Sequence, residues 1–134
     1  INCDFSNAVI HRTVFQNCKG MGLNLADGHL QNVQFINSVI DFSSFSFTKM
    51  KQVFFEETQI KNTDFFDVKW KQVWFERSYL NLVDFTSTSL MGIDFTTDEL
   101  EQLQVSTDSL KGCIVSRAQA VEFSRILGLV VKED

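Results

Sequence analysis

Almost every fifth residue of this chain is apolar from Phe5 to Val115. Of the 23 positions divisible by five in that stretch, 22 are apolar and the exception is Gly20. A period of five fits neither the 3.6-residue repeat of an α-helix nor the two-residue repeat of a β-strand. We therefore infer a chain that turns a corner every five residues and points the fifth side chain into a stacked core, which is a solenoid.

Sorting the five-residue segments into four groups separates their central residues by type. We name the groups sides one, two, three and four; they begin with the segments centred on positions 5, 10, 15 and 20 and recur every twenty residues. Nine of the 14 phenylalanines are centres of sides one and three, whereas sides two and four have mainly aliphatic centres. Coils of fifteen residues would mix the two kinds in every stack. The pattern favours a four-sided coil, in which rings about 4.8 Å apart stack.

The repeated unit is a small residue, then Asp or Asn, a central Phe or Leu, and two polar residues. Residues 3–7 (CDFSN) and 83–87 (VDFTS) show it clearly. This unit resembles that of the pentapeptide-repeat family over roughly residues 1–115. The resemblance implies an all-β solenoid, a right-handed quadrilateral β-helix with four repeats per coil. We therefore predict one β-helix domain over residues 1–115, and we expect the natural protein to extend further toward its N-terminus.

The last part of the chain, residues 116–134, predicts a capping helix and a tail. Ser116 followed by Gln119 has the spacing of a capping box, and Gly128 is placed to end a helix that runs from about Arg117 to Leu127. The coil before it is irregular, since Asp98 and Asp108 occupy small inward sites. We expect the helix to cover the column and to join two copies into a homodimer. The residues assigned to this cap and dimer interface are Phe123, Ile126, Leu127, Leu129, Val130 and Val131.

Few residues point to catalysis or to metal binding. The two histidines, His11 and His29, lie on the outward face of side two and have no acidic neighbour in the pattern. The three cysteines all lie two residues before a centre, among small residues, so we expect small buried side chains in a reducing cytoplasm. No apolar run has the length of a membrane span. The sequence predicts a protein that is not an enzyme, with no cofactor, no metal and no membrane partner.

Charge is sorted by side. Side two carries six cations against one acid, sides three and four are mildly acidic, and side one carries only acids. Two interpretations remain open for such a surface. It keeps a rigid rod soluble, or it presents a phosphate-like potential to a basic groove of a partner. The candidate partner-binding residues of side one are Asp4, Asp27, Asp64, Asp67 and Asp84.

Side three carries a second candidate surface, made of apolar residues beside its central ladder. Phe54 and Trp74 are twenty residues apart, so their rings are predicted to stack on the exterior. Stacking along the wall explains this pair as well as an interface does. The candidate hydrophobic patch consists of Val14, Ile36, Phe54 and Trp74.

Three segments narrow the resemblance. Residues 65–71 (FFDVKWK), 88–95 (TSLMGIDF) and 119–131 are similar to chromosomal Qnr proteins of Gram-positive bacteria and to the Qnr/MfpA type in general. That resemblance implies a DNA mimic that binds DNA gyrase or topoisomerase IV, protects it from quinolones, binds no nucleic acid itself and forms homodimers. The unbroken register leaves no room for the projecting loops of better-known Qnr proteins. The alternative is a general interaction scaffold whose unrelated partner binds the side-three patch.

Overall fold

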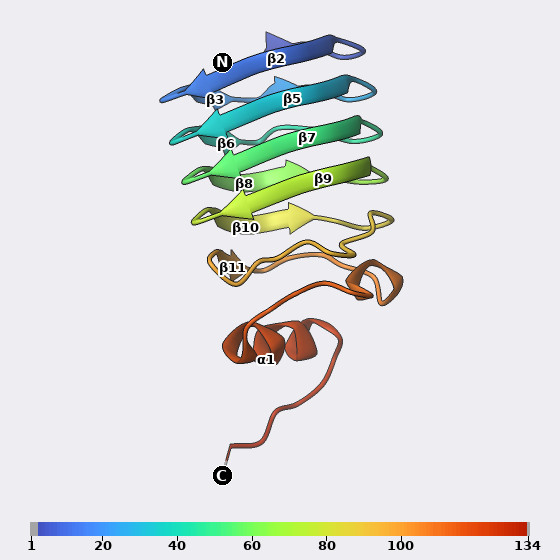
Figure 1. The fold of residues 1–134 in the computed structure, drawn as a ribbon. Helices are drawn as coiled ribbons and strands as arrows, with labels where there is room; N and C mark the ends of the chain where they lie inside the picture. Colours follow the sequence, from blue (N-terminus) through green and yellow to red (C-terminus); the bar gives the residue numbers. More distant parts are fainter. Residues whose placement is uncertain (1–2, 134) are drawn as a thin grey trace.

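The computed structural model describes residues 3–133, apart from the side chain of Met21, and shows a stack of coils closed by one helix (Figure 1). Neighbouring strands are parallel and pair residues that are twenty apart, such as Phe35 with Phe55. This confirms the predicted four-sided solenoid. One sheet has four strands, in the order β2 (Val9–Gln16), β5 (His29–Ile36), β7 (Lys49–Glu56) and β9 (Lys69–Glu76).

The opposite wall is a second parallel sheet. Its five strands are, in spatial order, β11 (Glu99–Glu101), β10 (Tyr79–Asp84), β8 (Gln59–Asp64), β6 (Val39–Asp41) and β3 (Lys19–Met21). A short pair, β1 (Cys3–Asp4) and β4 (Leu23–Asn24), continues side one toward the N-terminus. The eight-residue strands each cover sides two and three, because they bend at a middle residue such as Asn32.

Each corner is made by the residue two positions after a centre, which adopts a positive φ. Asn7, Asn17 and Asn37 have φ values of 61°, 56° and 47°. Asparagine tolerates this left-handed conformation better than most residues, since its short polar side chain bonds locally. Asparagine therefore suits these corners.

Two phenylalanine ladders fill the column. Along side three, the rings of Phe35 and Phe55 stack with centroids 5.0 Å apart and an interplanar angle of 3°. On side one, Phe45 and Phe65 stack at 4.8 Å. The ladders meet edge to face across the core, as between Phe35 and Phe45 at 6.1 Å. Rings of this kind bury large apolar areas and add specific pair energies, so they hold the coils in register.

The small inward residues also form hydrogen bonds between coils. The Thr58 hydroxyl donates to the Phe35 carbonyl at 3.2 Å, and the Thr58 N–H donates to the Ser78 hydroxyl at 3.2 Å. At the last coil, the Ser78 N–H donates to Asp98 Oδ1 at 2.8 Å. The column of small residues therefore satisfies backbone groups as well as fitting the available space.

The structure corrects two predictions, one about the last coil and one about the cysteines. A 3-10 turn over Asp108–Leu110 shifts the inward position by one residue, so Ser109 is buried and Asp108 is exposed. An unpaired carboxylate is costly to bury, whereas Ser109 donates to the Phe85 carbonyl. The cysteines are also less buried than predicted: Cys18 is exposed, and Cys3 and Cys113 are half-buried. Cys3 and Cys18 belong to the first of the described coils.

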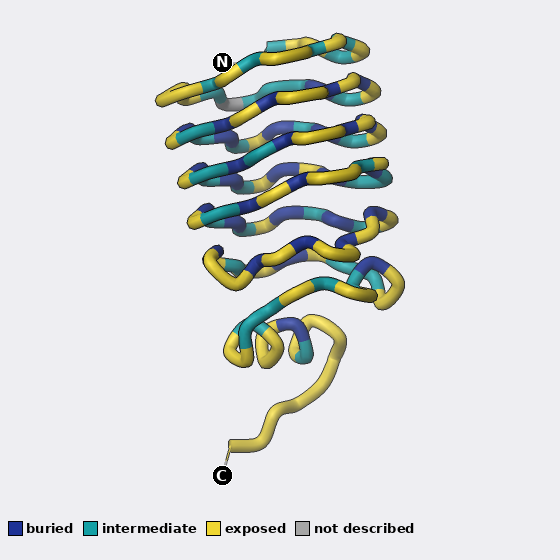
Figure 2. The backbone as a smooth tube through the Cα atoms, in the orientation of Figure 1, coloured by how far each residue is buried: buried dark blue, intermediate teal, exposed yellow. Residues whose placement is uncertain are grey.

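Helix α1 (Arg117–Ile126) closes the column and confirms the predicted cap (Figures 1 and 2). Both hydrogen bonds of the capping box are present, and Gly128 follows with φ of 91°. Gln119 also donates to the carbonyls of Phe95 and Asp98, at 2.6 and 2.9 Å. Only Phe123 of the helix is buried against the core.

Candidate functional site

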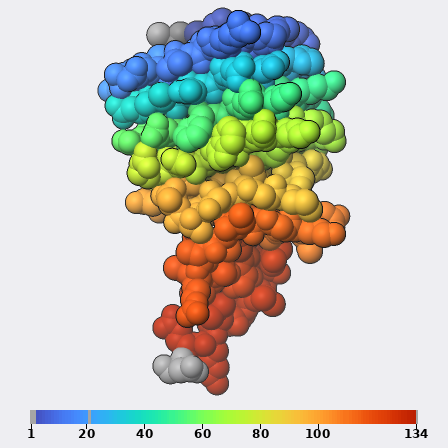
Figure 3. All heavy atoms as spheres, viewed as in Figure 1, coloured from blue at the N-terminus to red at the C-terminus, as the bar shows by residue number. Residues whose placement is uncertain are grey.

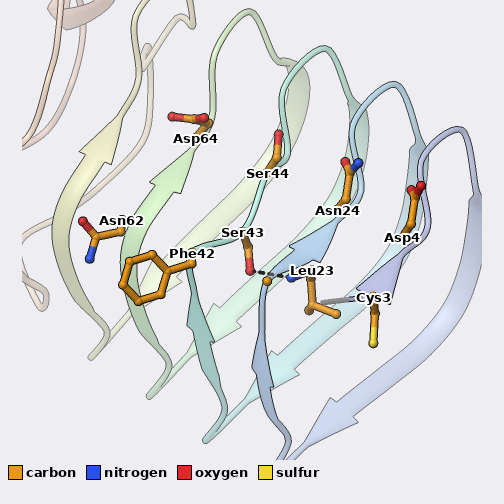
Figure 4. A pocket seen from close by; sticks show the side chains of 10 residues that line it. Cys3, Asp4, Leu23, Asn24, Phe42, Ser43, Ser44, Asn62 and Asp64 are labelled. Atoms are coloured by element: carbon orange, nitrogen blue, oxygen red, sulfur yellow. Dashed lines mark hydrogen bonds between the residues drawn. The ribbon is translucent and has the colours of Figure 1, made fainter. Parts of the chain in front are cut away.

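The acidic residues of side one lie in two columns along the stack. Strand pairing and single bridges place residues 4, 24, 44, 64, 84 and 104 in one column, which contains Asp4, Asp64 and Asp84. Figure 4 shows Asp4, Asn24, Ser44 and Asp64 in a row on successive coils. Asp27 and Asp67 lie at the neighbouring corner, with φ of 60° and 51°. The five predicted residues thus share one flank, although Ser44 and Phe47 interrupt them.

Part of this pattern has a structural reason that the sequence reasoning missed. Asp4 Oδ1 accepts the Ser6 N–H at 2.9 Å, and Asp84 Oδ1 accepts the Thr86 N–H at 2.8 Å. Asn24 does the same for Ala26 at 3.0 Å. Such turns explain why Asp or Asn precedes the centre. The hydrogen bond from Ser6 lowers the pKa of Asp4, so this carboxylate stays ionised while its second oxygen remains open to a partner.

Asp64 differs from the other acids of its column. Desolvation raises its pKa, and the negative charge of Asp84 in the next coil raises it further. Like charges directly opposite each other on neighbouring strands are destabilising. A cation from a partner would reduce this repulsion, so binding of a basic group would stabilise the pair.

Side one has few counter-charges of its own. Among residues 3–133, the only ion pair that involves this side joins Asp67 to Lys69 of side two at 3.5 Å. On side three, by contrast, Arg77 pairs with Glu56, with Glu57 at 3.6 Å and with Glu76 at 3.7 Å. Three of the four acids of side three therefore share one internal cation, whereas a single acid of side one, Asp67, has an ion-pair partner among the described residues.

Side two is the basic wall. Lys49 lies directly opposite Lys69, and Lys51 opposite Lys71, on the neighbouring strands β7 and β9. All four are exposed, and His11 and His29 are exposed on the coils beside them. The predicted sorting of charge by side is confirmed.

The side-three patch is present but interrupted. The rings of Phe54 and Trp74 lie 5.6 Å apart at 32°, which confirms the predicted exterior contact. Val14 is two coils away, with Gln34 between it and Phe54. Ile36 belongs to the adjacent column, opposite Glu56. Val14 and Trp74 are exposed, while Phe54 and Ile36 are half-buried.

Three aromatic residues on the edges of side one were not singled out by the sequence reasoning. Phe42 and Phe47 are 60% and 50% exposed, and Phe66 packs edge to face on Phe47 with ring centroids 5.6 Å apart. A hollow of about 560 Å³ lies on side one, lined by Phe42 together with Asp4, Ser44 and Asp64 (Figure 4). The available signal was that these phenylalanines are off the five-residue register.

The C-terminal residues assigned to the dimer interface are mostly exposed. Phe123 is buried in the cap, but Ile126 and Leu127 are exposed, contrary to a helix face that packs fully on the column. Leu129, Val130 and Val131 are exposed as well, and the tail leaves the column (Figure 3). Because these side chains do not pack on the column, they remain available for contact with another molecule.

The described residues show no arrangement typical of catalysis. Within 3–133, no group of three or more His, Cys, Asp or Glu is placed to hold a metal ion. Burial raises the pKa of the Cys113 thiol to about 11, which keeps it protonated and unreactive. No helix in the described part of the chain has the length and apolar character needed to cross a membrane. What the surface offers is charge and apolar area, which suit binding.

Comparison with known proteins identifies the repeat. Residues 8–85 match a family described as pentapeptide repeat region. A 47-residue stretch is 49% identical to YisX of Bacillus subtilis (strain 168), described as uncharacterized, and covers 35% of this chain and 22% of that protein. The pentapeptide repeat protein Rfr23 from the cyanobacterium Cyanothece 51142 aligns over 85% of this chain and 88% of its own, with a TM-score of 0.52 and 9% identity, so it shows the fold alone. QnrB1, a plasmid-mediated fluoroquinolone resistance protein, aligns over 97% of this chain and 96% of its own, with 12% identity and a TM-score of 0.24.

Proposed function

The chain belongs to the pentapeptide-repeat family, and from that premise we propose that it is a cytoplasmic, non-enzymatic mimic of DNA that binds DNA gyrase or topoisomerase IV. The observation that carries the proposal is the flank of side one, where Asp4, Asp64 and Asp84 share a column and have no ion-pair partner within residues 3–133. A rigid row of carboxylates presents to a basic groove a potential like that of phosphates. By occupying that groove, the protein would protect the enzyme from quinolones.

The test compares charge removal on two sides. Asp4→Asn, Asp64→Asn and Asp84→Asn together remove three charges but keep the oxygens that accept the turn hydrogen bonds. The control removes three charges from side four, with Asp41→Asn, Glu99→Gln and Glu101→Gln. Supercoiling by gyrase is then measured with and without a quinolone. We expect the wild type and the control to change gyrase activity and the side-one variant to lose the effect. A wild type without effect, or equal loss in both variants, would reject the proposal.

We also propose that α1 and the tail join two copies into a homodimer. Val130 is 94% exposed, and Leu127 and Leu129 beside it are exposed as well. Apolar residues gathered in one short segment are typical of an interface. Light scattering of the wild type should give twice the mass of one chain, and Leu129→Ser with Val130→Ser should give a monomer with an unchanged β-solenoid spectrum. A monomeric wild type would contradict the dimer without affecting the proposed use of side one.

A second function is favoured by the side-three contact. The Phe54–Trp74 pair places a large apolar area on a wall whose core is already filled by its own ladder. A scaffold for an unrelated protein would use this patch. If the protein is such a scaffold, Phe54→Ser with Trp74→Ser should abolish capture of the unrelated partner and leave the β-solenoid spectrum unchanged. Unchanged capture by this variant would show that the pair serves only the packing of the wall.

A further inference from the structure

Phe42, Phe47 and Leu82 are apolar residues at corner positions, where they serve the fold poorly. Their φ values are 53°, 60° and 56°, in the left-handed region that bulky side chains disfavour. Their side chains are exposed, with 60%, 50% and 46% of their surface open to solvent. Neither backbone fit nor core packing therefore explains an aromatic or leucine side chain here.

The same corners show what the fold itself prefers. Asn62 lies between Phe42 and Leu82 along one corner column, and Asp27 and Asp67 flank Phe47 along the other. The corner hydrogen bonds are the same for both kinds of residue: Phe47 N–H donates to the Phe66 carbonyl, and Asp67 N–H donates to the Thr86 carbonyl. Asparagine or aspartate would complete the turn at a lower cost in backbone strain.

The aromatic corners enclose the acidic wall. In the third coil, Phe42 and Phe47 stand on either edge of side one, and the outward residues between them are the small Ser44 and Ser46. Phe66 extends the second edge by packing on Phe47. The hollow beside Phe42 has Asp4 and Asp64 in its lining (Figure 4). Lys61 of side four has its Nζ 5.7 Å from the centre of the Tyr79 ring.

Exposed aromatic residues are enriched in protein-binding surfaces relative to the rest of a protein's surface. Duplex DNA has no side chains that project in this way, so a groove shaped only for phosphates would not accommodate two phenylalanine edges. We infer that side one binds a protein segment that combines lysine or arginine with apolar side chains, and that Phe42, Phe47 and Phe66 fill apolar sites on that segment. The inference rests on the proposed function only in placing the partner on side one.

A pair of peptides tests the chemistry directly. The two have equal length and the same lysine positions, and the remaining positions hold leucine in one and serine in the other. Affinity is measured by fluorescence anisotropy at low and at physiological salt. We expect the leucine peptide to bind about tenfold more tightly or better, with the preference retained as salt rises, since apolar contacts are not screened. Equal affinities would overturn the inference.

Variants locate the site and separate binding from folding. Phe42→Asn with Phe47→Asn should abolish the preference while the melting temperature stays the same or rises, because the new residues match their columns. Met91→Asn removes a similarly exposed apolar residue from side two and is the matched control. A retained preference, or a melting temperature that falls by several degrees, would show that the aromatic residues serve something other than this binding.

Gyrase binding by the same variants separates this inference from the proposed function. Loss of gyrase binding in the phenylalanine variant as well as in the side-one aspartate variant supports both the inference and the proposed function. A leucine preference that depends on Phe42 and Phe47, without any gyrase binding by the wild type, sustains the mixed surface and rejects gyrase as its partner. Gyrase binding that needs only the aspartates, with equal peptide affinities, sustains pure mimicry and rejects the apolar contribution.

Discussion

At the scale of single residues, aspartate occupies three environments that give its carboxylate three different pKa values. At Asp4 and Asp94 a turn hydrogen bond lowers the pKa. For Asp64, desolvation and the neighbouring Asp84 raise it. Asp98 is buried beneath the cap, and desolvation raises its pKa to about 7. One residue type therefore serves turn formation, surface charge and the end of an internal hydrogen-bond column.

Asp98 gives a testable pH dependence. Its folded-state pKa lies above that of the unfolded chain, so the folded state holds the proton more tightly and stability falls as pH rises from about 4 to about 7. Asp98→Asn keeps an oxygen for the Ser78 N–H and removes the ionisation. Relative to that of the wild type, the free energy of unfolding of the variant should rise by about 2–4 kcal/mol between pH 4 and pH 8, as measured by urea unfolding at each pH. Asp94→Asn, an exposed control, should show no gain of that sign, and a constant difference across pH would contradict the prediction.

The inward positions could be predicted from the sequence. The neighbours that fill a missing side chain or accept a hydrogen bond could not, and neither could the exposure of the side chains at the corners. Phe35 and Phe55 follow directly from the period, because a coil of fixed length repeats one geometry. Gly20 breaks the period. The side chain of Leu23 from the next segment occupies the space beside it, with Cδ1 3.2 Å from the point where a Cβ on Gly20 would lie. Asp98 has the position of a small residue but accepts a backbone hydrogen bond as Ser78 does. Such replacements of one contact by another depend on which residues are neighbours in three dimensions, and the five-residue pattern does not contain that information.

At the scale of elements, lysines on the neighbouring strands β7 and β9 of the basic wall repel each other. Lys51 lies opposite Lys71, and like charges in directly opposed positions are destabilising. Lys51→Glu should therefore stabilise the protein by about 0.5 kcal/mol, and Lys51→Gln by less. Urea unfolding in low and high salt measures both, and the gain should shrink with salt because the pair is exposed. A loss of stability in the glutamate variant at low salt would show that the lysine is held by a contact other than this pair.

The junction of α1 with the last coil depends on Gln119. Its side chain satisfies the carbonyls of Phe95 and Asp98 and accepts the N–H of Ser116. Gln119→Ala leaves these groups unpaired and should cost about 2 kcal/mol, whereas Ser116→Ala should cost about 1 kcal/mol, as a simple loss of the N-cap. Thermal unfolding followed by circular dichroism measures both. Equal costs would mean that the helix contributes through its own cap rather than through the carbonyls of the column.

At the scale of the whole molecule, the five-residue period predicted the architecture, while the surface was predicted only in part. Because every side repeats after twenty residues, charge could be sorted by side from the sequence, and the pairing of Lys49 with Lys69 confirms that sorting. The ion pairs could not be predicted in this way, since Arg77 contacts acids on its own coil and on the preceding coil. The contrast between the acids of side three that share Arg77 and the mostly unpaired acids of side one therefore required the structure.

A stack of coils also predicts a gradient of stability along its axis. Each coil is held mainly by its neighbours, and in the first coil Phe5 is half exposed while Ile10 and Phe15 are only partly buried. At the other end α1 covers the column. For a polypeptide of residues 1–134, hydrogen exchange followed by mass spectrometry should show the fastest exchange over residues 3–20, intermediate exchange over 85–105, and the slowest over 43–80. Uniform protection would instead indicate one cooperative unit. In that polypeptide Asp4 lies in the least protected coil and Asp64 in the most protected region, so a partner that contacts both should slow exchange most in the first coil.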